Sequence, residues 1–185
     1  MVGRPEHSGN GYDRAVTAAR TRALDLIIRA GVMYRLHPYA SPDRHGRERD
    51  ERPSYGTDAA AALGVAPERV LKTLVASVDD RLVLAVVPVD RELDLKRLAD
   101  AVGARRAVMA EPSEAERATG FVVGGISPLG SRRALPVVID ASAMDHETVF
   151  ISAGRRGLQV ELAPPDLVRL SSAHSAAISR DVGSI

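Results

Sequence analysis

Cysteine is absent from this chain of 185 residues, and no long apolar run occurs in it. Disulfides, thiolate zinc sites and cysteine nucleophiles are excluded, because each requires a sulfur atom that the sequence lacks. The longest apolar stretches, such as residues 82–89, are well short of the roughly 20 residues that span a bilayer. Residues 1–20 also contain no apolar signal segment. We therefore expect a cytoplasmic protein.

An excess of one charge is lacking too, since 25 basic and 24 acidic residues leave a net charge of +1. A chain that coats nucleic acid by bulk charge is excluded, so any anionic partner has to meet a local patch. Only two of the basic residues are lysines, Lys72 and Lys96. Lys72 stands inside the apolar stretch 70–75, where desolvation disfavours the ammonium unless a partner or ligand compensates. A buried structural ion pair and a functional amine both fit this position.

The hydrophobic content of 45% is enough for one compact domain. We expect a loosely ordered extension over residues 1–20, a globular domain over residues 21–180 and a charged surface loop at 41–53. The apolar patterns predict strands at 32–39, 70–78, 82–89, 137–139, 148–151 and 158–162. The strands 70–78 and 82–89 are expected to form an antiparallel hairpin with Asp79-Asp80 in its turn, and their apolar continuity predicts burial on both faces. They predict helices at 14–30, 58–63 (capped by Thr57), 94–102 and 164–170, and a short one opened by a Ser113–Glu116 capping box. The fold class is therefore α+β, with a mixed, largely antiparallel sheet flanked by helices.

Most familiar catalytic patterns are missing. The five histidines have no metal-ligand spacing, no serine stands in a nucleophile elbow, and the glycines after residue 120 are not followed by the lysine of a phosphate loop.

Two glycine loops remain, each directly after an apolar segment. Residues 124–130 read GGISPLG and residues 152–157 read SAGRRG. Such loops can present main-chain amides to an anion or an oxyanion, and the two arginines suit phosphate. A plain tight turn and solvated arginines are the structural alternatives.

Four segments together resemble the YbaK family, the free-standing relatives of the editing domain of bacterial prolyl-tRNA synthetases. They are KTL at 72–74, GGISPLG at 124–130, ID at 139–140 and SAGRRGL at 152–158, and the resemblance extends over residues 23–177. It implies a curved mixed sheet and an aminoacyl-tRNA deacylase that clears Cys-tRNA(Pro), with Cys-tRNA(Cys) as a further substrate. It implies no metal and no organic cofactor.

The resemblance also implies site residues. Lys72 matches the essential lysine of the family, and Gly124 matches the glycine whose main chain faces the scissile ester. The substrate-binding positions that it implies are Tyr39, Tyr55, Thr73, Gly125, Ile126, Ser127, Asp140, Ser152 and Gln159.

Three positions depart from the family pattern. Tyr55 stands where phenylalanine is usual, Ala153 replaces a glycine, and Gln159 stands where aspartate is common. An amide in place of a carboxylate removes a charge near the pocket, so a related deacylase acting on Ala-tRNA(Pro) is an alternative. A non-catalytic domain that binds tRNA or a synthetase is another.

The resemblance implies that the thiol of the cysteinyl group attacks its own ester. Amides of Gly124, Gly125 and Ile126 are the expected oxyanion donors. The acceptor stem of tRNA(Pro) is expected to contact Arg132, Arg133, Arg155 and Arg156. Because the net charge is near zero, we expect weak binding of tRNA alone, with prolyl-tRNA synthetase as a partner.

Overall fold

The computed structural model describes residues 20–40 and 55–183. Most of the predicted N-terminal extension and the charged loop at 41–53 lie outside these residues. The α-helices are α2 (Arg22–Ala30), α3 (Tyr55–Leu63), α4 (Leu95–Ala101), α5 (Pro112–Thr119) and α6 (Pro164–Ser171), and two 3-10 helices are η1 (Pro67–Arg69) and η2 (Ala141–Asp145). Among the described residues, no helix combines the length and the apolar character needed to cross a membrane.

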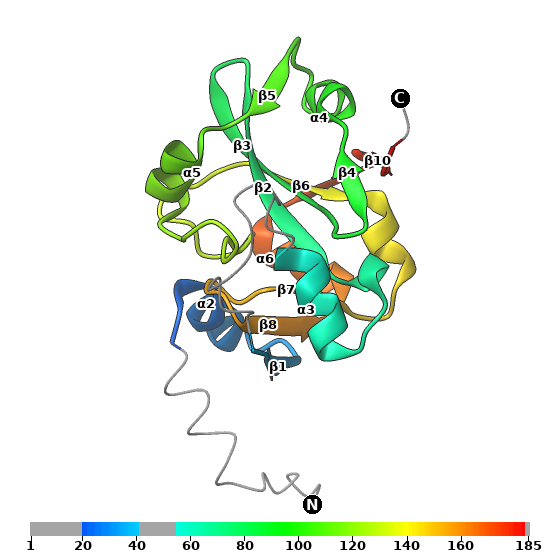
Figure 1. Cartoon of the computed structure of the whole chain (residues 1–185). Helices are drawn as coiled ribbons and strands as arrows, with labels where there is room; N and C mark the ends of the chain where they lie inside the picture. The colour runs from blue at the N-terminus through cyan, green and yellow to red at the C-terminus, as the bar shows by residue number, and fades with distance from the viewer. Residues whose placement is uncertain (1–19, 41–54, 184–185) are drawn as a thin grey trace, which may run out of the picture.

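The strands of the described chain form three sheets. A five-stranded mixed sheet has the order β5 (Ala107–Met109), β2 (Leu71–Val78), β3 (Arg81–Pro88), β6 (Val137–Asp140), β9 (His174–Ala176). An antiparallel sheet contains β1 (Tyr34–Pro38), β8 (Leu158–Leu162) and β7 (Val149–Ser152), and β10 (Ser179–Asp181) pairs with β4 (Arg91–Leu93). In Figure 1 the β2–β3 hairpin reaches the top beside β5, whereas β1, β7 and β8 lie together below. The α+β class is confirmed, and its strands are divided among sheets.

The β2–β3 hairpin is the longest ladder and matches the predicted one closely. Asp79 and Asp80 form its turn with φ values of 42° and 64°, the left-handed pair that suits a tight hairpin turn. Residues 82–88 are all buried, as their apolar continuity predicted. The largest hydrophobic cluster joins this hairpin and β6 to β7, β8, α2 and α6, so one core holds two of the sheets together.

Three predicted helix starts are wrong. α2 begins at Arg22 with the extended residue Thr21 as its N-cap, so the helix predicted over 14–30 does not run through residues 20 and 21. α3 begins at Tyr55, so Thr57 lies inside its first turn and does not cap it. α5 begins at Pro112 with Glu111 in the N-cap position, which excludes the Ser113–Glu116 capping box. The Glu116 carboxylate instead accepts a hydrogen bond from the amide of Val123 at 2.8 Å.

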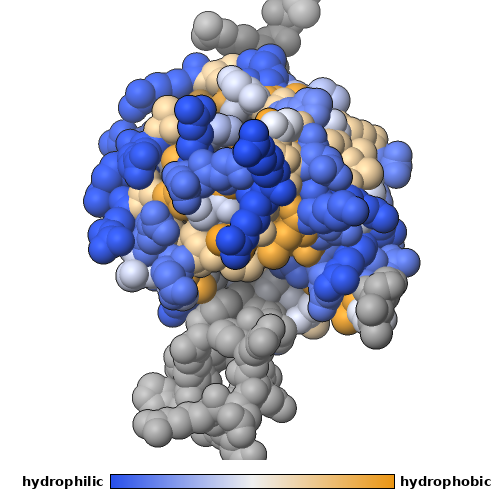
Figure 2. All heavy atoms as spheres, turned by 90° about the horizontal axis from the view of Figure 1, so that it is seen from above, coloured by the Kyte–Doolittle hydropathy of each residue, from blue (hydrophilic) through white to orange (hydrophobic). Residues whose placement is uncertain are grey.

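The surface of the described chain is predominantly hydrophilic where the molecule is seen from above, with apolar areas between the charged side chains (Figure 2). Val108 and Met109 of the edge strand β5 are 40% and 47% exposed. Short strands of this kind leave little unpaired backbone at a sheet edge.

Asp140 ties the end of β6 to the segment before β10. Its buried carboxylate accepts hydrogen bonds from the amide and hydroxyl of Ser142 and from the amides of Ile178 and Ser179, at 2.6–3.1 Å. Burial acts to raise the pKa of Asp140, but these hydrogen bonds outweigh it and hold the pKa below its ordinary value. Asp140 therefore stabilises the fold as an anion.

We predict that Asp140→Ala lowers the free energy of unfolding by at least about 2 kcal/mol, because buried amides lose their acceptor. Because the pKa of the folded state is depressed, the contribution of Asp140 is present above its unfolded pKa and is lost as the pH falls through its folded pKa. Urea denaturation between pH 7 and pH 3 measures both effects. Asp166→Ala, which removes an exposed ion pair with Arg169, is the control and should cost under about 1 kcal/mol. Equal losses for the two variants would contradict this role.

Candidate active site

A pocket of about 480 Å³ lies between the two larger sheets and the glycine loops. β2 contributes Lys72 and Thr73, the first glycine loop contributes Gly124 and Ile126, and β7 and β8 contribute Ser152 and Gln159. The remaining lining is mostly apolar and comes from α3, β5, α5 and their neighbours. Met109 of β5 lines the pocket and is 47% exposed. Six of the predicted site residues therefore meet in one cavity.

Lys72 is half-buried and donates hydrogen bonds to two main-chain carbonyls, one directly after β3 and one at the first residue of β4. Its Nζ lies 2.5 Å from the carbonyl oxygen of Arg91 and 3.4 Å from that of Val89. Lys72 makes no ion pair with a described residue. The structural ion pair that the sequence allowed is therefore not formed there, and the ammonium is held by two carbonyls instead. Burial lowers the pKa of its ammonium, against the opposing charges of Glu92 and Asp90.

The first glycine loop opens with a tight turn over residues 122–125. The amide of Gly125 donates to the carbonyl of Val122 at 2.9 Å, and Gly124 has a φ of +84°. A positive φ at the third residue is the mark of a type II turn and favours glycine there. Gly125 is thus occupied and cannot serve as the predicted oxyanion donor without breaking the turn. Among the described residues, the amides of Gly124 and Ile126 donate to no protein acceptor.

The second glycine loop packs directly behind the first. A Cβ atom built on Gly125 would lie 2.9 Å from the amide nitrogen of Arg156 and 3.0 Å from the backbone of Arg155. Only glycine fits at this contact, because the neighbouring atoms are backbone and cannot move aside. The second loop therefore supports the first from behind, and the first loop lines the pocket with Gly124 and Ile126.

Two residues that line the pocket each carry a buried side-chain oxygen with no hydrogen-bond partner among the described residues. They are Oγ1 of Thr73 and Oε1 of Gln159, and Gln159 is only 7% exposed. Buried polar groups are nearly always paired, so unpaired ones that line a cavity indicate a place for a polar ligand. Ser152 differs, since its Oγ accepts a hydrogen bond from the amide of Gly154 at 3.2 Å.

Four predicted substrate-binding residues, Tyr39, Gly125, Ser127 and Asp140, are not part of the described lining of this pocket. Tyr39 is half-buried against the cluster formed by α3, Val70 and Phe150, and the side chain of Tyr55 lies outside the described structure. Ser127 is fully buried and accepts a hydrogen bond from the amide of Leu129, which fixes the loop itself. Asp140 is saturated by the structural hydrogen bonds already described.

The four predicted tRNA-contacting arginines have exposed side chains, but they are not equivalent. Arg132, Arg133 and Arg155 are exposed beside the glycine loops. Arg156 donates from Nε and Nη2 to the carbonyl of Val123, at 2.9 and 2.6 Å. Its guanidinium is therefore engaged with the first glycine loop and is not simply presented to solvent.

The start of α2 holds both loops and was not predicted as part of the site. Arg22 donates to the carbonyls of Gly130, Thr119 and Gly120 at 2.7–3.0 Å and lies 4.8 Å above the ring of Phe121. Thr21, the N-cap of α2, donates from its hydroxyl to the carbonyl of Ala153 in the second loop. Carbonyl acceptors leave no trace in a sequence, so nothing distinguished Arg22 from the other arginines.

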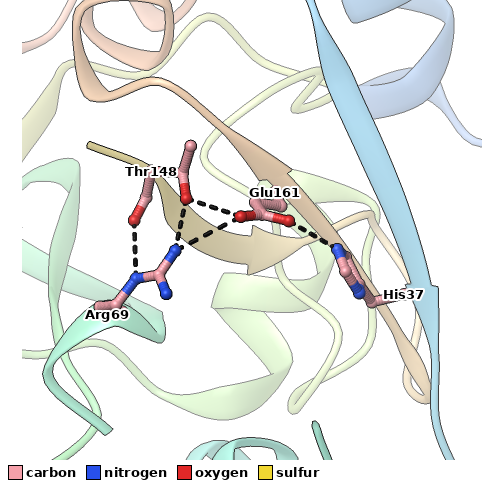
Figure 3. Close-up of polar contacts among 4 residues, drawn as sticks. All are labelled: His37, Arg69, Thr148 and Glu161. Carbon is pink, nitrogen blue, oxygen red and sulfur yellow. Dashed lines mark hydrogen bonds and ion pairs between the residues drawn. The ribbon is translucent and has the colours of Figure 1, made fainter. Parts of the chain in front are cut away.

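A polar network supports the start of β2 (Figure 3). Glu161 of β8 accepts hydrogen bonds from the hydroxyl of Thr148 at 2.6 Å and from Arg69 at 3.3 Å, and it contacts Nε2 of His37 at 2.8 Å. Burial acts to raise the pKa of Glu161, but these partners lower it overall. Since Arg69 lies three residues before Lys72, the network joins β1 and β8 to the strand that carries the lysine.

Comparison with known sequences and structures identifies the class of protein to which this fold and pocket belong, the aminoacyl-tRNA editing domains. The sequence model of the aminoacyl-tRNA editing domain matches residues 53–170. A protein of Enterococcus faecalis that is assigned by its name as a Cys-tRNA(Pro)/Cys-tRNA(Cys) deacylase, EbsC, is 32% identical over 165 residues, 88% of this chain and 95% of its own.

Two further similarities are to proteins whose names refer to prolyl-tRNA synthetase. A proline–tRNA ligase of Anaeromyxobacter is 34% identical over 122 residues, 66% of this chain and 20% of the ligase. A crystal structure described as a trans-editing enzyme for prolyl tRNA synthetase superposes with a TM-score of 0.69 at 24% identity, over 94% of this chain and 99% of that one, and supports the fold. The chain belongs to the aminoacyl-tRNA editing domain family.

The lowered pKa of Lys72 predicts a pH-dependent stability. Between its folded pKa and the unfolded value of 10.5, unfolding takes up a proton, so the free energy of unfolding rises with pH across this window. Lys72→Met lacks the titrating group and should lose this rise, whereas Lys96→Met, on the exposed face of α4, should keep it. Urea denaturation from pH 7 to pH 10.5 measures the difference. Parallel curves for the wild type and Lys72→Met would contradict the shift.

Proposed function

We propose that this protein is an aminoacyl-tRNA deacylase that clears Cys-tRNA(Pro) in trans, with Cys-tRNA(Cys) as a further substrate. The observation that carries the proposal is the pair of unoccupied amides of Gly124 and Ile126 in a pocket that also holds Lys72. The similarity to EbsC over nearly the full length of both chains supports the cysteinyl substrate.

The substrate supplies the nucleophile in this proposal. The thiolate of the cysteinyl group attacks its own carbonyl carbon, a C–S bond forms, and the ester C–O bond breaks. The thiol proton ends on the ribose oxygen, so the products are a thiolactone and tRNA with a free hydroxyl. Attack within one molecule needs only orientation, which is worth effective molarities of about 10⁵ to 10⁸ M.

The pocket residues have separate tasks in this reaction. The amides of Gly124 and Ile126 donate to the oxyanion that forms at the ester carbonyl. Thr73, Ser152 and Gln159 face the aminoacyl group, and the unpaired oxygens of Thr73 and Gln159 accept or exchange hydrogen bonds with it. Lys72 neutralises a phosphate of the terminal adenosine or the thiolate.

The acceptor stem lies outside the pocket in this proposal. Arg132, Arg133 and Arg155 are exposed positive groups beside the loops and bind its phosphates. Because the net charge of the chain is only +1, binding of tRNA alone is weak, and prolyl-tRNA synthetase delivers the charged tRNA. The segment shared with a proline–tRNA ligase supports this partner.

Hydrolysis of Ala-tRNA(Pro) by water is the second candidate, and Gln159 favours it. A neutral amide in the apolar pocket puts no charge beside a small side chain, and the described site offers space for a water. A domain that binds without catalysis is the third candidate, against which the retained Lys72 argues.

A panel of charged tRNA(Pro) separates these candidates. We predict rapid release of cysteine, at least about 100-fold faster than serine, because a hydroxyl has a much higher pKa than a thiol and is a weaker nucleophile near neutral pH. Single-turnover assays with Cys-, Ser- and Ala-tRNA(Pro), with mass spectrometry of the products, measure this. Equal rates on the three substrates would favour attack by water, and no release from any would remove the deacylase proposal.

Substitutions of Lys72 test whether this side chain takes part in the proposed reaction. Lys72→Ala should lower kcat/KM by at least about 100-fold, comparable to the loss of one preorganised donor. Lys72→Arg should fail as well, because a planar guanidinium cannot take the place of an ammonium between the carbonyls of Val89 and Arg91. Lys96→Ala is the matched control and should retain full activity. A folded Lys72→Ala protein with most of its activity would overturn the assignment.

A further inference from the structure

Both main-chain polar groups of Val123 are held by charged side chains. Its amide donates to Oε1 of Glu116 at 2.8 Å, and its carbonyl accepts from Nε and Nη2 of Arg156 at 2.9 and 2.6 Å. Hydrogen bonds with an ionised partner are roughly twice as strong as neutral ones. Val123 is half-buried against the main hydrophobic core, and three such bonds on one turn residue exceed what a simple loop requires.

The peptide that Arg156 holds is the one that ends in the amide of Gly124. The carbonyl of Val123 and the N–H of Gly124 belong to the same trans peptide, so they point in opposite directions. Arg156 binds the carbonyl from the side of the second loop and does not line the pocket, whereas Gly124 does. The N–H of Gly124 is thereby directed away from Arg156.

This orientation is not fixed by the turn alone. Type I and type II turns differ by a rotation of this central peptide through about 180°, and glycine tolerates the third position of both. Rotation would carry the N–H of Gly124 away from its present direction and withdraw the carbonyl of Val123 from Arg156. The two hydrogen bonds from the guanidinium favour the type II form, and they also polarise the peptide, which strengthens its N–H as a donor.

We propose that Arg156 is a positioning residue, which locks the Val123–Gly124 peptide so that the amide of Gly124 stays directed at the substrate ester. This rests on the proposed deacylase function, and it gives Arg156 a role other than contact with the acceptor stem. A donor that acts on the oxyanion stabilises the transition state and not bound substrate, so its loss lowers kcat and leaves KM unchanged. Loss of a contact with a tRNA phosphate would instead raise KM and leave kcat unchanged.

The test compares Arg156→Ala, Arg156→Lys and the control Arg117→Ala, which removes the same charge from an exposed position on α5. Arg156→Ala should lower the single-turnover rate on Cys-tRNA(Pro) by about 10- to 100-fold, less than the full loss of an oxyanion donor. KM and its salt dependence should change less than twofold. Lysine should restore part of the rate, and so should free guanidinium ion added to Arg156→Ala.

The free protein supplies an independent measurement. The ¹⁵N-labelled amide of Gly124 should shift and exchange faster in Arg156→Ala, with no change in Arg117→Ala, while thermal unfolding confirms that each variant is folded. An unchanged rate with a higher KM and a smaller salt slope would make Arg156 a tRNA contact and overturn the proposal. If the wild type releases no amino acid, the proposed deacylase function is wrong. The NMR shift and exchange rate of the Gly124 amide in Arg156→Ala then still show whether Arg156 holds the turn. An unaltered Gly124 amide in Arg156→Ala would overturn that role too.

Discussion

The site depends on one close contact between two stretches of backbone. Gly125 lies so near the backbone of Arg155 and Arg156 that a Cβ atom would stand 2.9–3.0 Å from it. The contact brings the guanidinium of Arg156 within reach of the carbonyl of Val123, and it lies behind Gly124 and Ile126, which line the pocket. A side chain at residue 125 would separate the loops and release both. The chemistry proposed for the pocket therefore rests on the absence of a side chain.

Distant segments stabilise this contact. Thr21 binds the second loop at Ala153, and Arg22 binds the first at Gly130, so the opening turn of α2 holds the two loops together from the outer side. On the inner side, β7 and β8 carry Ser152 and Gln159 into the pocket as part of an antiparallel ladder. Catalytic amides gain from such rigid support, because a donor that is already oriented does not have to reorganise during the reaction.

The fold could be predicted from the sequence where local pattern and burial agree, as in the β2–β3 hairpin with Asp79 and Asp80 in its turn. It could not be predicted where a short strand is defined only by its partner, as in β4, β5, β9 and β10, each three residues long. The same division applies to the site. Lys72 stood out because lysine is scarce, whereas Arg22 and Arg156 act on carbonyls that every residue carries, and no residue pattern marks such acceptors.

Lys72 shows how a buried cation can be both structural and available. An ammonium has three N–H donors in the tetrahedral arrangement of its nitrogen. Two of them point at the carbonyls of Arg91 and Val89, which fixes the side chain in the pocket and offsets part of the cost of burial. A third remains for a ligand, and the charge itself is not neutralised by an ion pair within the described chain. In the proposed function, an anionic group of the substrate would therefore meet a cation whose position is already set. A guanidinium could match the charge but not this division of donors, which explains why a chain that uses arginine almost everywhere else carries lysine here.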